Sequence, residues 1–425
     1  MRGAVAGWRR VVRWAVVLIG LPPLTLFLLG VVLLVALTPI EEPVQFDVEA
    51  ARGISYTPPA CVVPGPGLPP DLEIQASNNV IDLVEFEGAF YLAFRTGPTH
   101  YASPKARIIV LRSTDRARWE LDTTIEKPDA DLREPRFLVY QGRLFLYFIE
   151  AGNTFYWFEP QGIFAIERVG PGRWTPSRAI FEPGYIIWRA KAHNGVAYMS
   201  VYYGKGLYNL FRPAGEVRLL ASTDGYDWRP VSEKPQVTGE GAEEADFAFD
   251  AEGNLVAVVR LEMQGGMVCR APKDDLGAWE CRYTPHKYDS PFLLRRGGAF
   301  YVVARRNVSG AYDRGWNRLP GALRRGSQLI RYAFTRKRTS LFRLDVDGME
   351  LVPILDFPSK GDTAYAALAP IGENAYYMVY YSTDIAGRDW PWSLGQVIGC
   401  NIYETVIAFP PVNDLLPLES GAESE

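Results

Sequence analysis

Three arginines stand at the same place in a pattern that recurs along the chain. Arg95, Arg260 and Arg305 each follow a turn glycine by seven residues. An equal offset predicts equivalent positions in different structural repeats. Guanidinium groups placed there could hold a carboxylate through paired hydrogen bonds. The alternative is that these arginines form salt bridges between neighbouring repeats.

A second set of polar residues opens the strands of the same repeats. The set contains both signs of charge, which is typical of a ligand-binding site when the residues converge on one place. The alternative is that these residues are solvated and line a water-filled channel without binding a ligand. The members are Asn79, Glu134, Arg136, Arg189, Lys191, Glu244, Asp246, Asp289, Asp362 and Tyr365.

Six copies of a strand–turn–strand pattern must position these side chains. The copies alternate in polarity, are rich in β-branched and aromatic residues, and recur about every fifty residues, the length of a four-stranded blade. The pattern therefore predicts an all-β, six-bladed β-propeller, whose inner strands line a central channel. The polar residues that open those strands would face one funnel. The copies span 78–95, 133–150, 188–203, 244–260, 288–305 and 362–381.

The N-terminus predicts a membrane anchor. Residues 14–37 form an apolar run without a charge, long enough to cross a bilayer as a helix. Four arginines precede the run, and Glu41 and Glu42 follow it, so residues 1–13 should be cytoplasmic and the bulk of the chain outside. The alternative is a cleaved signal peptide, but the run is longer than a usual signal sequence and has a poor cleavage pattern.

Five segments are therefore expected. They are a cytoplasmic N-terminus (1–13), a transmembrane anchor (14–37), a Pro-rich tether (38–75), the propeller (76–412) and a C-terminal tail (413–425). This organisation predicts a single-pass membrane protein whose propeller lies in the periplasm or the extracellular space.

Composition argues against several classes of function. The net charge is −4 and the basic residues are spread along the chain, so no nucleic-acid partner is expected. His100, His193 and His286 are far apart and lack the spacing of metal ligands, so no metal site is expected. No other pattern in the sequence predicts a cofactor.

Four cysteines fit an oxidising compartment. Cys269 and Cys281 flank an expected hairpin and are predicted to pair. Cys61 and Cys400 lie near the two ends of the folded part, and their pairing would clamp N- and C-terminal strands into one blade. The alternative is four free, buried thiols.

Two turns share the pattern Ser-x-Asp-x-x-x-Trp. They begin at Ser113 and Ser222. The pattern resembles the Asp box of sialidases and other propellers, a structural element at the blade rim. Ser and Asp side chains can bond the backbone of the turn, and the tryptophan would pack beneath it.

Longer segments resemble the active-site strands of sialidases. GAEEADFAFDAEGNLVAVVR is similar to the segment with the glutamate partner and the second active-site arginine, which the resemblance places on Glu244 and Arg260. The segment at Arg305 resembles that of the third arginine. DTAYAALAPIGENAYYMVYY resembles the strand of the nucleophilic tyrosine, here Tyr365. The resemblance implies that the glutamate withdraws the phenolic proton while the tyrosine attacks the anomeric carbon, so Glu244 and Tyr365 should lie within hydrogen-bonding distance.

The chain also departs from the sialidase pattern. Asn78 and Asn79 stand where the first arginine is expected, and Arg95 is a candidate replacement. The loop TGPTHYASPKARI lacks the usual acid aspartate, and His100 is its only proton donor near neutral pH. We therefore take His100 as the candidate acid.

The sequence supports three functions. The first is a glycoside hydrolase that acts on sialic or other acidic sugars. The second is a glycan-binding propeller without catalysis, which the missing acid and first arginine favour over an authentic sialidase. The third is a structural propeller of the cell envelope, against which the tyrosine–glutamate pair and the two arginines argue.

Overall fold

The structure is a computed structural model that describes residue 25 and residues 41–152, 159–313 and 320–412. Apart from residue 25, the predicted cytoplasmic segment and anchor lie outside the described residues, as does the predicted tail at 413–425. Within the described ranges, no helix is both long enough and apolar enough to cross a bilayer. The described residues from 42 onward belong to one compact unit.

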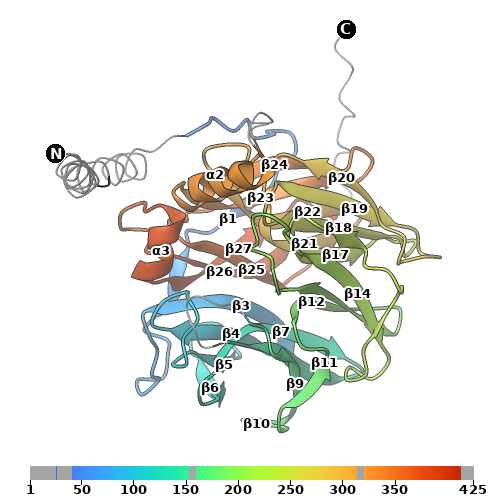
Figure 1. Ribbon diagram of the computed structural model, residues 1–425. Helices are drawn as coiled ribbons and strands as arrows, with labels where there is room; N and C mark the ends of the chain where they lie inside the picture. Colours follow the sequence, from blue (N-terminus) through green and yellow to red (C-terminus); the bar gives the residue numbers. More distant parts are fainter. Residues whose placement is uncertain (1–24, 26–40, 153–158, 314–319, 413–425) are drawn as a thin grey trace, which may run out of the picture. The chain divides into compact units, whose positions relative to one another are not determined.

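The described strands form six antiparallel sheets around a common axis (Figure 1). The inner strands of consecutive blades pack side by side, and the inner strand of blade six packs on that of blade one. The sheets therefore close a ring, and the predicted six-bladed β-propeller is confirmed.

Blades one to three come from the N-terminal half of the ring. Blade one holds β3 (Ser77–Phe86), β4 (Ala89–Gly97), β5 (Arg107–Ser113) and β6 (Glu120–Ile125). Blade two holds β7 (Asp131–Tyr140), β8 (Arg143–Ala151), β9 (Gly162–Gly170), β10 (Arg173–Trp174) and β11 (Arg178–Phe181). Blade three holds β12 (Tyr185–His193), β13 (Val196–Tyr203), β14 (Glu216–Ser222), β15 (Arg229–Pro230) and β16 (Val237–Thr238).

Blades four to six complete the ring. Blade four holds β17 (Ala242–Phe249), β18 (Leu255–Leu261), β19 (Gly266–Ala271) and β20 (Glu280–Thr284). Blade five holds β21 (Asp289–Arg296), β22 (Ala299–Asn307), β23 (Lys337–Asp345) and β24 (Glu350–Asp356). Blade six holds β25 (Thr363–Pro370), β26 (Ala375–Ser382), β27 (Asn401–Ala408), β1 (Ser55–Tyr56) and β2 (Ala60–Val63).

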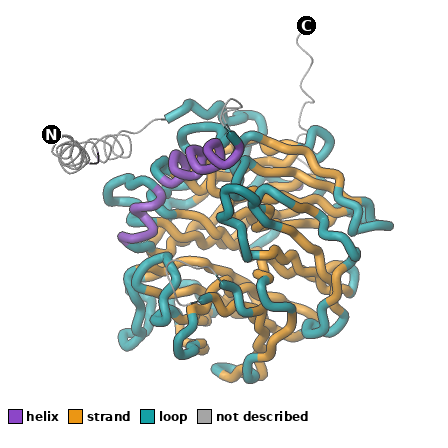
Figure 2. The backbone as a smooth tube through the Cα atoms, viewed as in Figure 1, coloured by secondary structure: helices purple, strands orange, loops and turns teal. Residues whose placement is uncertain are grey.

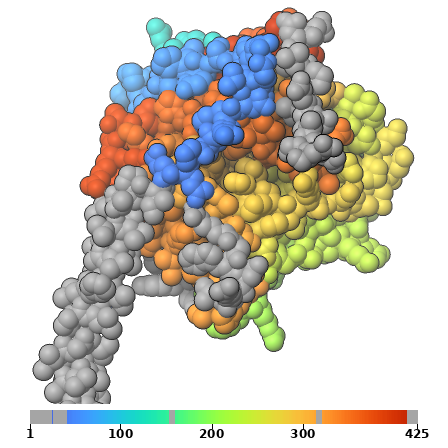
Figure 3. Space-filling view, turned by 90° about the horizontal axis from the view of Figure 1, so that it is seen from above, coloured from blue at the N-terminus to red at the C-terminus, as the bar shows by residue number. Residues whose placement is uncertain are grey.

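Strands from both ends of the folded region close the ring in blade six. Both β1 and β2 pair with β27, and the side chains of Thr57 and Thr405 approach to 3.2 Å across this junction. In the space-filling view the early segment (blue) lies against the orange and red elements of the last blades (Figure 3). Part of the predicted 38–75 tether therefore belongs to the propeller.

One disulfide prediction is confirmed and the other is wrong. Cys269 and Cys281 stand opposite each other in β19 and β20 and are bonded, with a Cα–Cα distance of 4.0 Å. Cys61 and Cys400 are free. Their blade does join both chain ends, but Cys61 pairs in register with Tyr403, and Cys400 is buried with its Sγ beside Asp362.

The two Ser-x-Asp turns have the same hydrogen bonds. Asp115 accepts from the two backbone N–H groups two and three residues on, and Asp224 does the same. The fourth residue of the pattern, directly after the aspartate, has a left-handed backbone, with φ of 81° at Gly225 and 66° at Arg116. A Cβ at Gly225 would meet the Phe145 ring at 2.8 Å, so close packing adds to the requirement for glycine there.

Each inner strand carries a β-bulge at the same place. The bulged residue has left-handed backbone in five of the six blades, a conformation that costs a non-glycine residue about 1–3 kcal/mol. Bulges re-aim side chains and are common near functional sites, so this ring of six is where a site is expected. Its members are Val80, Glu134, Trp188, Glu244, Ser290 and Tyr365.

Two helices, which the sequence analysis did not predict, lie next to each other on one side of the ring (Figure 2). They are α2 (Gly321–Ala333), between β22 and β23, and α3 (Trp392–Ile398), between β26 and β27. Each begins after a proline, Pro320 and Pro391 respectively, which ends the preceding extended chain. The helices interrupt two blades at the end of the channel where the bulges lie.

Candidate functional site

A cavity of about 400 Å³ opens at the bulged end of the inner strands. Four of the six bulge residues line it, together with side chains from α2, α3 and the loops before β5 and β14. The predicted site residues that line this cavity are His100, Glu134, Glu244, Arg260, Arg305 and Tyr365.

Tyr365 and Glu134 form the central polar pair of the cavity. The Tyr365 hydroxyl donates a hydrogen bond to Glu134 Oε1 at 3.1 Å, and Arg136 donates to Glu134 Oε2 at 2.9 Å. Burial raises the pKa of Glu134 above its usual value. Burial, together with the charges of Glu134 and Glu244, raises the pKa of Tyr365 well above its usual value. The phenol is therefore neutral at rest, beside a carboxylate that is a stronger base than an exposed one.

The predicted partner of Tyr365 was wrong. Glu244 accepts from Arg260 Nη1 at 2.7 Å through one oxygen and from the backbone N–H of Ser290 at 2.7 Å through the other. Blades two and four are both two positions from blade six, so blade order could not separate Glu134 from Glu244. The contacts of Glu244 distinguish the two glutamates, because Arg260 and Ser290 already bind both carboxylate oxygens of Glu244.

Arg260 is surrounded by acidic side chains. Its nitrogens lie 3.0 Å from Glu243, 2.7 Å from Glu244 and 3.1 Å from Asp289, and it also pairs with Glu262. Burial alone would lower the pKa of Arg260, but these carboxylates raise it well above its usual value. These carboxylates fix the position of the guanidinium at the cavity wall.

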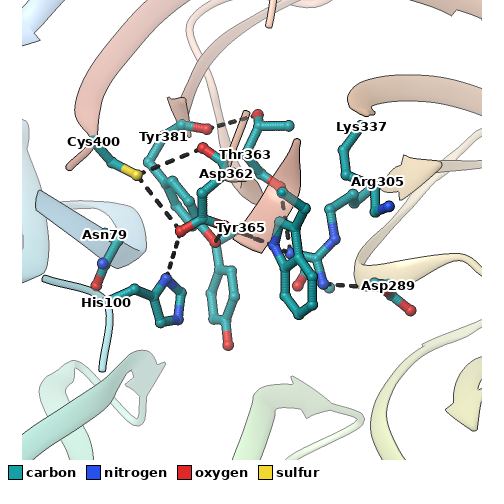
Figure 4. Close-up of polar contacts among 12 residues, drawn as sticks. Asn79, His100, Asp289, Arg305, Lys337, Asp362, Thr363, Tyr365, Tyr381 and Cys400 are labelled. Carbon is teal, nitrogen blue, oxygen red and sulfur yellow. Dashed lines mark hydrogen bonds and ion pairs between the residues drawn. The ribbon is translucent and has the colours of Figure 1, made fainter. Parts of the chain in front are cut away.

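Arg305 is held in a similar way at the junction of blades five and six. It donates to Asp289 Oδ2 at 3.0 Å, and its guanidinium lies 4.8 Å from the Trp392 ring (Figure 4). Tyr332 of α2 also donates to Asp289. The predicted site residue Asp289 thus accepts hydrogen bonds from Arg305 and Tyr332 and forms an ion pair with Arg260, and it is fully buried.

Arg95 is not a ligand-binding arginine. It is fully buried, bonds both oxygens of Asp131 at 3.0 and 2.7 Å, and donates to the backbone oxygens of Thr99 and Tyr101. Its equal offset from the turn glycine does give an equivalent place in the blade. However, Asp131 of the next blade binds the guanidinium at that place. Arg95 therefore forms a salt bridge between neighbouring blades, which was the alternative interpretation of its position.

Arg133 is a third cavity arginine that the sequence analysis missed. It bonds Asp131 and the backbone oxygen of His100, and it lines the cavity with Arg260 and Arg305. Its position in the sequence could have indicated this role. Arg133 directly precedes the bulge residue Glu134, just as Glu243 directly precedes the bulge residue Glu244.

His100 and Asp362 form a second polar pair of the cavity. His100 Nδ1 lies 2.6 Å from Asp362 Oδ2 (Figure 4). Asp362 also accepts from Trp392 Nε1 at 2.9 Å and from the Tyr381 hydroxyl at 3.2 Å. Burial alone would raise the pKa of Asp362, but His100 lowers it. Asp362 is therefore an ionised acceptor, which makes Nδ1 the donor and leaves Nε2 to exchange protons with a ligand.

Glu243 and Glu262 are further acidic residues that the sequence analysis did not single out. Both line the cavity around Arg260. Burial raises the pKa of Glu243 well above its usual value, and Glu262 adds to the effect. Arg260 and Lys287 overcome burial and lower the pKa of Glu262. Because the two pKa values shift in opposite directions, Glu243 is the neutral acid and Glu262 is the carboxylate of this pair.

The remaining predicted residues lie deeper in the channel. Arg136 is fully buried, and its guanidinium lies 4.7 Å from the Trp188 ring and 5.1 Å from the Tyr365 ring. Asp246 is also fully buried; it pairs with Lys191 at 2.8 Å and accepts from the backbone N–H of Leu293. These two residues brace the walls below the cavity. In the described ranges, no cluster of three or more His, Cys, Asp or Glu side chains could hold a metal ion.

Comparisons with known proteins agree on the fold. No protein-family model and no curated protein matches the sequence. A protein of unknown function from Dyadobacter fermentans DSM 18053 matches 84% of this chain over its entire length, with a TM-score of 0.61 and 14% identity. Trypanosoma rangeli sialidase in complex with the inhibitor DANA matches 86% of this chain, with a TM-score of 0.55 and 13% identity; the chain covers 61% of that sialidase.

The endosialidase of phage phi92 is similar at the same level. The match covers 83% of this chain and 70% of that chain, with a TM-score of 0.51 and 10% identity. Identities this low establish the fold alone. The predicted sialidase-like β-propeller is thereby confirmed.

Proposed function

We propose that this protein is a membrane-anchored, extracytoplasmic glycoside hydrolase that acts on sialic or other acidic sugars. The observation that supports this best is the hydrogen bond from the Tyr365 hydroxyl to Glu134 Oε1. Both residues sit on left-handed bulges that aim them into one cavity. A phenol that is hydrogen-bonded to a buried carboxylate can lose its proton to that carboxylate and so act as a nucleophile.

The first step transfers the sugar to the tyrosine. Glu134 takes the phenolic proton, Tyr365 oxygen bonds to the anomeric carbon, and the glycosidic C–O bond breaks. The raised pKa of Glu134 makes its carboxylate a stronger base toward the phenol. Tyrosine is an established exception to the use of two carboxylates.

His100 supplies the proton that the leaving oxygen needs. In its protonated form it donates from Nε2 while Asp362 holds Nδ1. In the second step neutral His100 takes a proton from water, the water oxygen bonds to the anomeric carbon, and the bond to Tyr365 breaks. Glu134 then returns its proton to the phenolate, so the enzyme ends as it began.

The arginines of the cavity favour a sugar that carries a carboxylate. Arg133, Arg260 and Arg305 enter one cavity from blades two, four and five, and each keeps a positive charge that a sugar carboxylate could share. Their acidic partners favour a second candidate, a neutral sugar, because those carboxylates already offset the arginine charges.

The test is a panel of fluorogenic glycosides that includes sialosides, uronides and neutral hexosides. We expect hydrolysis of at least one acidic glycoside and a loss of about 10³-fold or more in kcat for Tyr365→Phe. Tyr202→Phe, which changes a tyrosine of the same cavity on β13, is the matched control and should retain most activity. Cleavage of neutral hexosides alone would select the second candidate. Equal activity of the two variants would exclude Tyr365 as the nucleophile.

A further inference from the structure

The exposed apolar side chains of this protein are unevenly distributed. Twelve large apolar side chains are exposed among the described residues. Six of them lie on three short segments that border the cavity, namely the loop 204–214, α2 and α3; we call these segments the mouth rim. The six are Tyr208, Phe211, Leu323, Ile330, Val397 and Ile398.

The three segments form one continuous border. Arg325 of α2 donates to the backbone oxygen of Leu210 at 3.2 Å, which joins the helix to the loop. The rings of Tyr332 in α2 and Trp392 in α3 are 5.5 Å apart, which joins the two helices. Figure 2 shows these helices (purple) along one side of the ring. The apolar side chains therefore belong to one face of the molecule.

Helix α2 buries polar side chains against the propeller and exposes apolar ones. Gln328 and Tyr332 are buried toward the propeller. Leu323 and Ile330, seven residues apart and so on one side of the helix, are 62% and 61% exposed. Phe211 on the neighbouring loop is 81% exposed. Apolar side chains at this exposure have a cost in water that contact with an apolar phase removes.

The charge of the mouth rim differs from that of the whole chain. The chain has a net charge of −4, whereas the rim contains five basic residues and no acidic residue in its sequence. Basic and apolar residues interleaved on one helix and loop are typical of segments that rest on an anionic lipid surface. The five are Lys205, Arg212, Arg324, Arg325 and Arg331. Among them, Arg325 also pairs with Glu240 at 2.6 Å, and Arg331 donates to the backbone oxygens of Ala311 and Tyr312.

The chain enters the propeller at the same end. The Glu42 N–H donates to the backbone oxygen of Val308 at 3.0 Å. Val308 directly follows β22, three residues after the cavity residue Arg305. The proposed anchor ends at residue 37, and five residues of extended chain reach at most about 18 Å. An anchor there would hold the cavity end of the propeller close to the bilayer.

We infer that the mouth rim rests on the surface of an anionic phospholipid bilayer, with Phe211, Leu323 and Ile330 inserted among the lipids. The cavity then opens onto the membrane surface. Its ligand would be a glycan carried on a lipid or on another membrane component, rather than one free in solution; this last point alone rests on the proposed function.

Vesicle binding of residues 41–425 tests the inference without the anchor. All six sheets and the closing strands lie within this part, which is one compact unit. We expect it to sediment with phosphatidylcholine vesicles that contain phosphatidylglycerol, at least about tenfold more tightly than with phosphatidylcholine alone. The triple variant F211S/L323S/I330S should weaken this binding at least about tenfold.

The matched control is L121S/V169S, which removes exposed apolar side chains of blades one and two that lie outside the rim. It should bind vesicles as the parent does. Absence of vesicle binding, an equal loss in the control, or no preference for phosphatidylglycerol would overturn the inference. Self-association that the triple variant abolishes, without vesicle binding, would assign the rim instead to contact with a second copy. Glycoside hydrolysis is measured separately, so failure of one proposal leaves the other standing.

Discussion

Tyr365 and Glu134 occupy the same bulge position in blades six and two, and their side chains meet at 3.1 Å across the channel. Val80 holds that position in the intervening blade one. The ring places Glu134 and Glu244 at equivalent bulges two blades from Tyr365, and the hydrogen bonds of Glu244 to Arg260 and Ser290 leave Glu134 as the partner.

Glu134→Gln and Glu244→Gln separate the two glutamates. We expect Glu134→Gln to lower kcat by about 10²–10⁴-fold, since it removes the base. Glu244→Gln should act mainly through the position of Arg260 and lower kcat less. The pKa of Glu134 is raised above its usual value, so parent kcat should fall with decreasing pH from a midpoint above about 4.3. Initial rates from pH 3 to 9 measure both effects, and a larger loss in Glu244→Gln would reverse the assignment.

His100→Gln tests the proton donor. Protonation matters most when the leaving oxygen is basic, so alkyl glycosides should lose about 10²-fold or more in kcat. Nitrophenyl glycosides, which leave without help, should change little. His286→Gln is the control, because that histidine lies in another pocket, between blades four and five. If Glu243→Gln showed this leaving-group dependence and His100→Gln did not, Glu243 would be the acid.

Asp131→Asn should destabilise the fold. Burial would raise the pKa of Asp131, but Arg133 and Arg95 lower it below its usual value. The folded pKa is therefore depressed, so this stability is present above about pH 4 and is lost as the pH falls. The variant leaves the fully buried Arg95 short of a counter-charge and should lose about 3–5 kcal/mol at pH 7.

Urea unfolding from pH 3 to 7 measures this effect. The difference between parent and Asp131→Asn should shrink toward low pH. Asp227→Asn removes one partner of an exposed ion pair with Arg178 and should change stability by less than about 1 kcal/mol. A similar change in both variants would mean that the buried pair contributes no special stability.

Removal of the disulfide should cost stability without loss of the fold. Cys269 and Cys281 are separated by 12 residues, and closure of a loop of this size contributes about 3 kcal/mol. C269S/C281S should therefore unfold at lower urea than the parent, whereas Cys61→Ser, at a free and half-buried thiol, should change little. Thermal and urea midpoints of the three proteins would be compared, and an unchanged C269S/C281S would contradict the expectation.

The sequence predicted the architecture better than the pairings within it. Repeated strand–turn–strand copies define six blades, because strand periodicity and spacing are local properties. The partner of Tyr365 depends on contacts between blades. Glu244 matched the sialidase pattern, but Ser290 and Arg260 bind both its oxygens. Arg95 likewise matched its repeat, and only Asp131 of the next blade decides its role.

The helices were missed for a physical reason. Helix α2 includes Gly321 and Gly326, which lower helix propensity. Its buried side chains are Gln328 and Tyr332, whereas Leu323 and Ile330 are exposed, so its apolar residues do not mark a face that packs on the core. The failed pairing of Cys61 with Cys400 has a similar cause. Strand order brings both chain ends into blade six, but register, which sequence does not display, sets Cys61 opposite Tyr403.

The closure of blade six sets an order for biosynthesis. Thr57 and Thr405 meet across a sequence separation of 348 residues, so β1 and β2 must wait for β27 until nearly the whole propeller has been made. Contacts this distant in sequence slow folding. Until β27 arrives, β1, β2 and the β26 edge of blade six are unpaired and prone to join other chains. The protein should therefore depend on chaperones late in its folding, and truncations that remove β27 should be degraded rather than accumulate as shorter propellers.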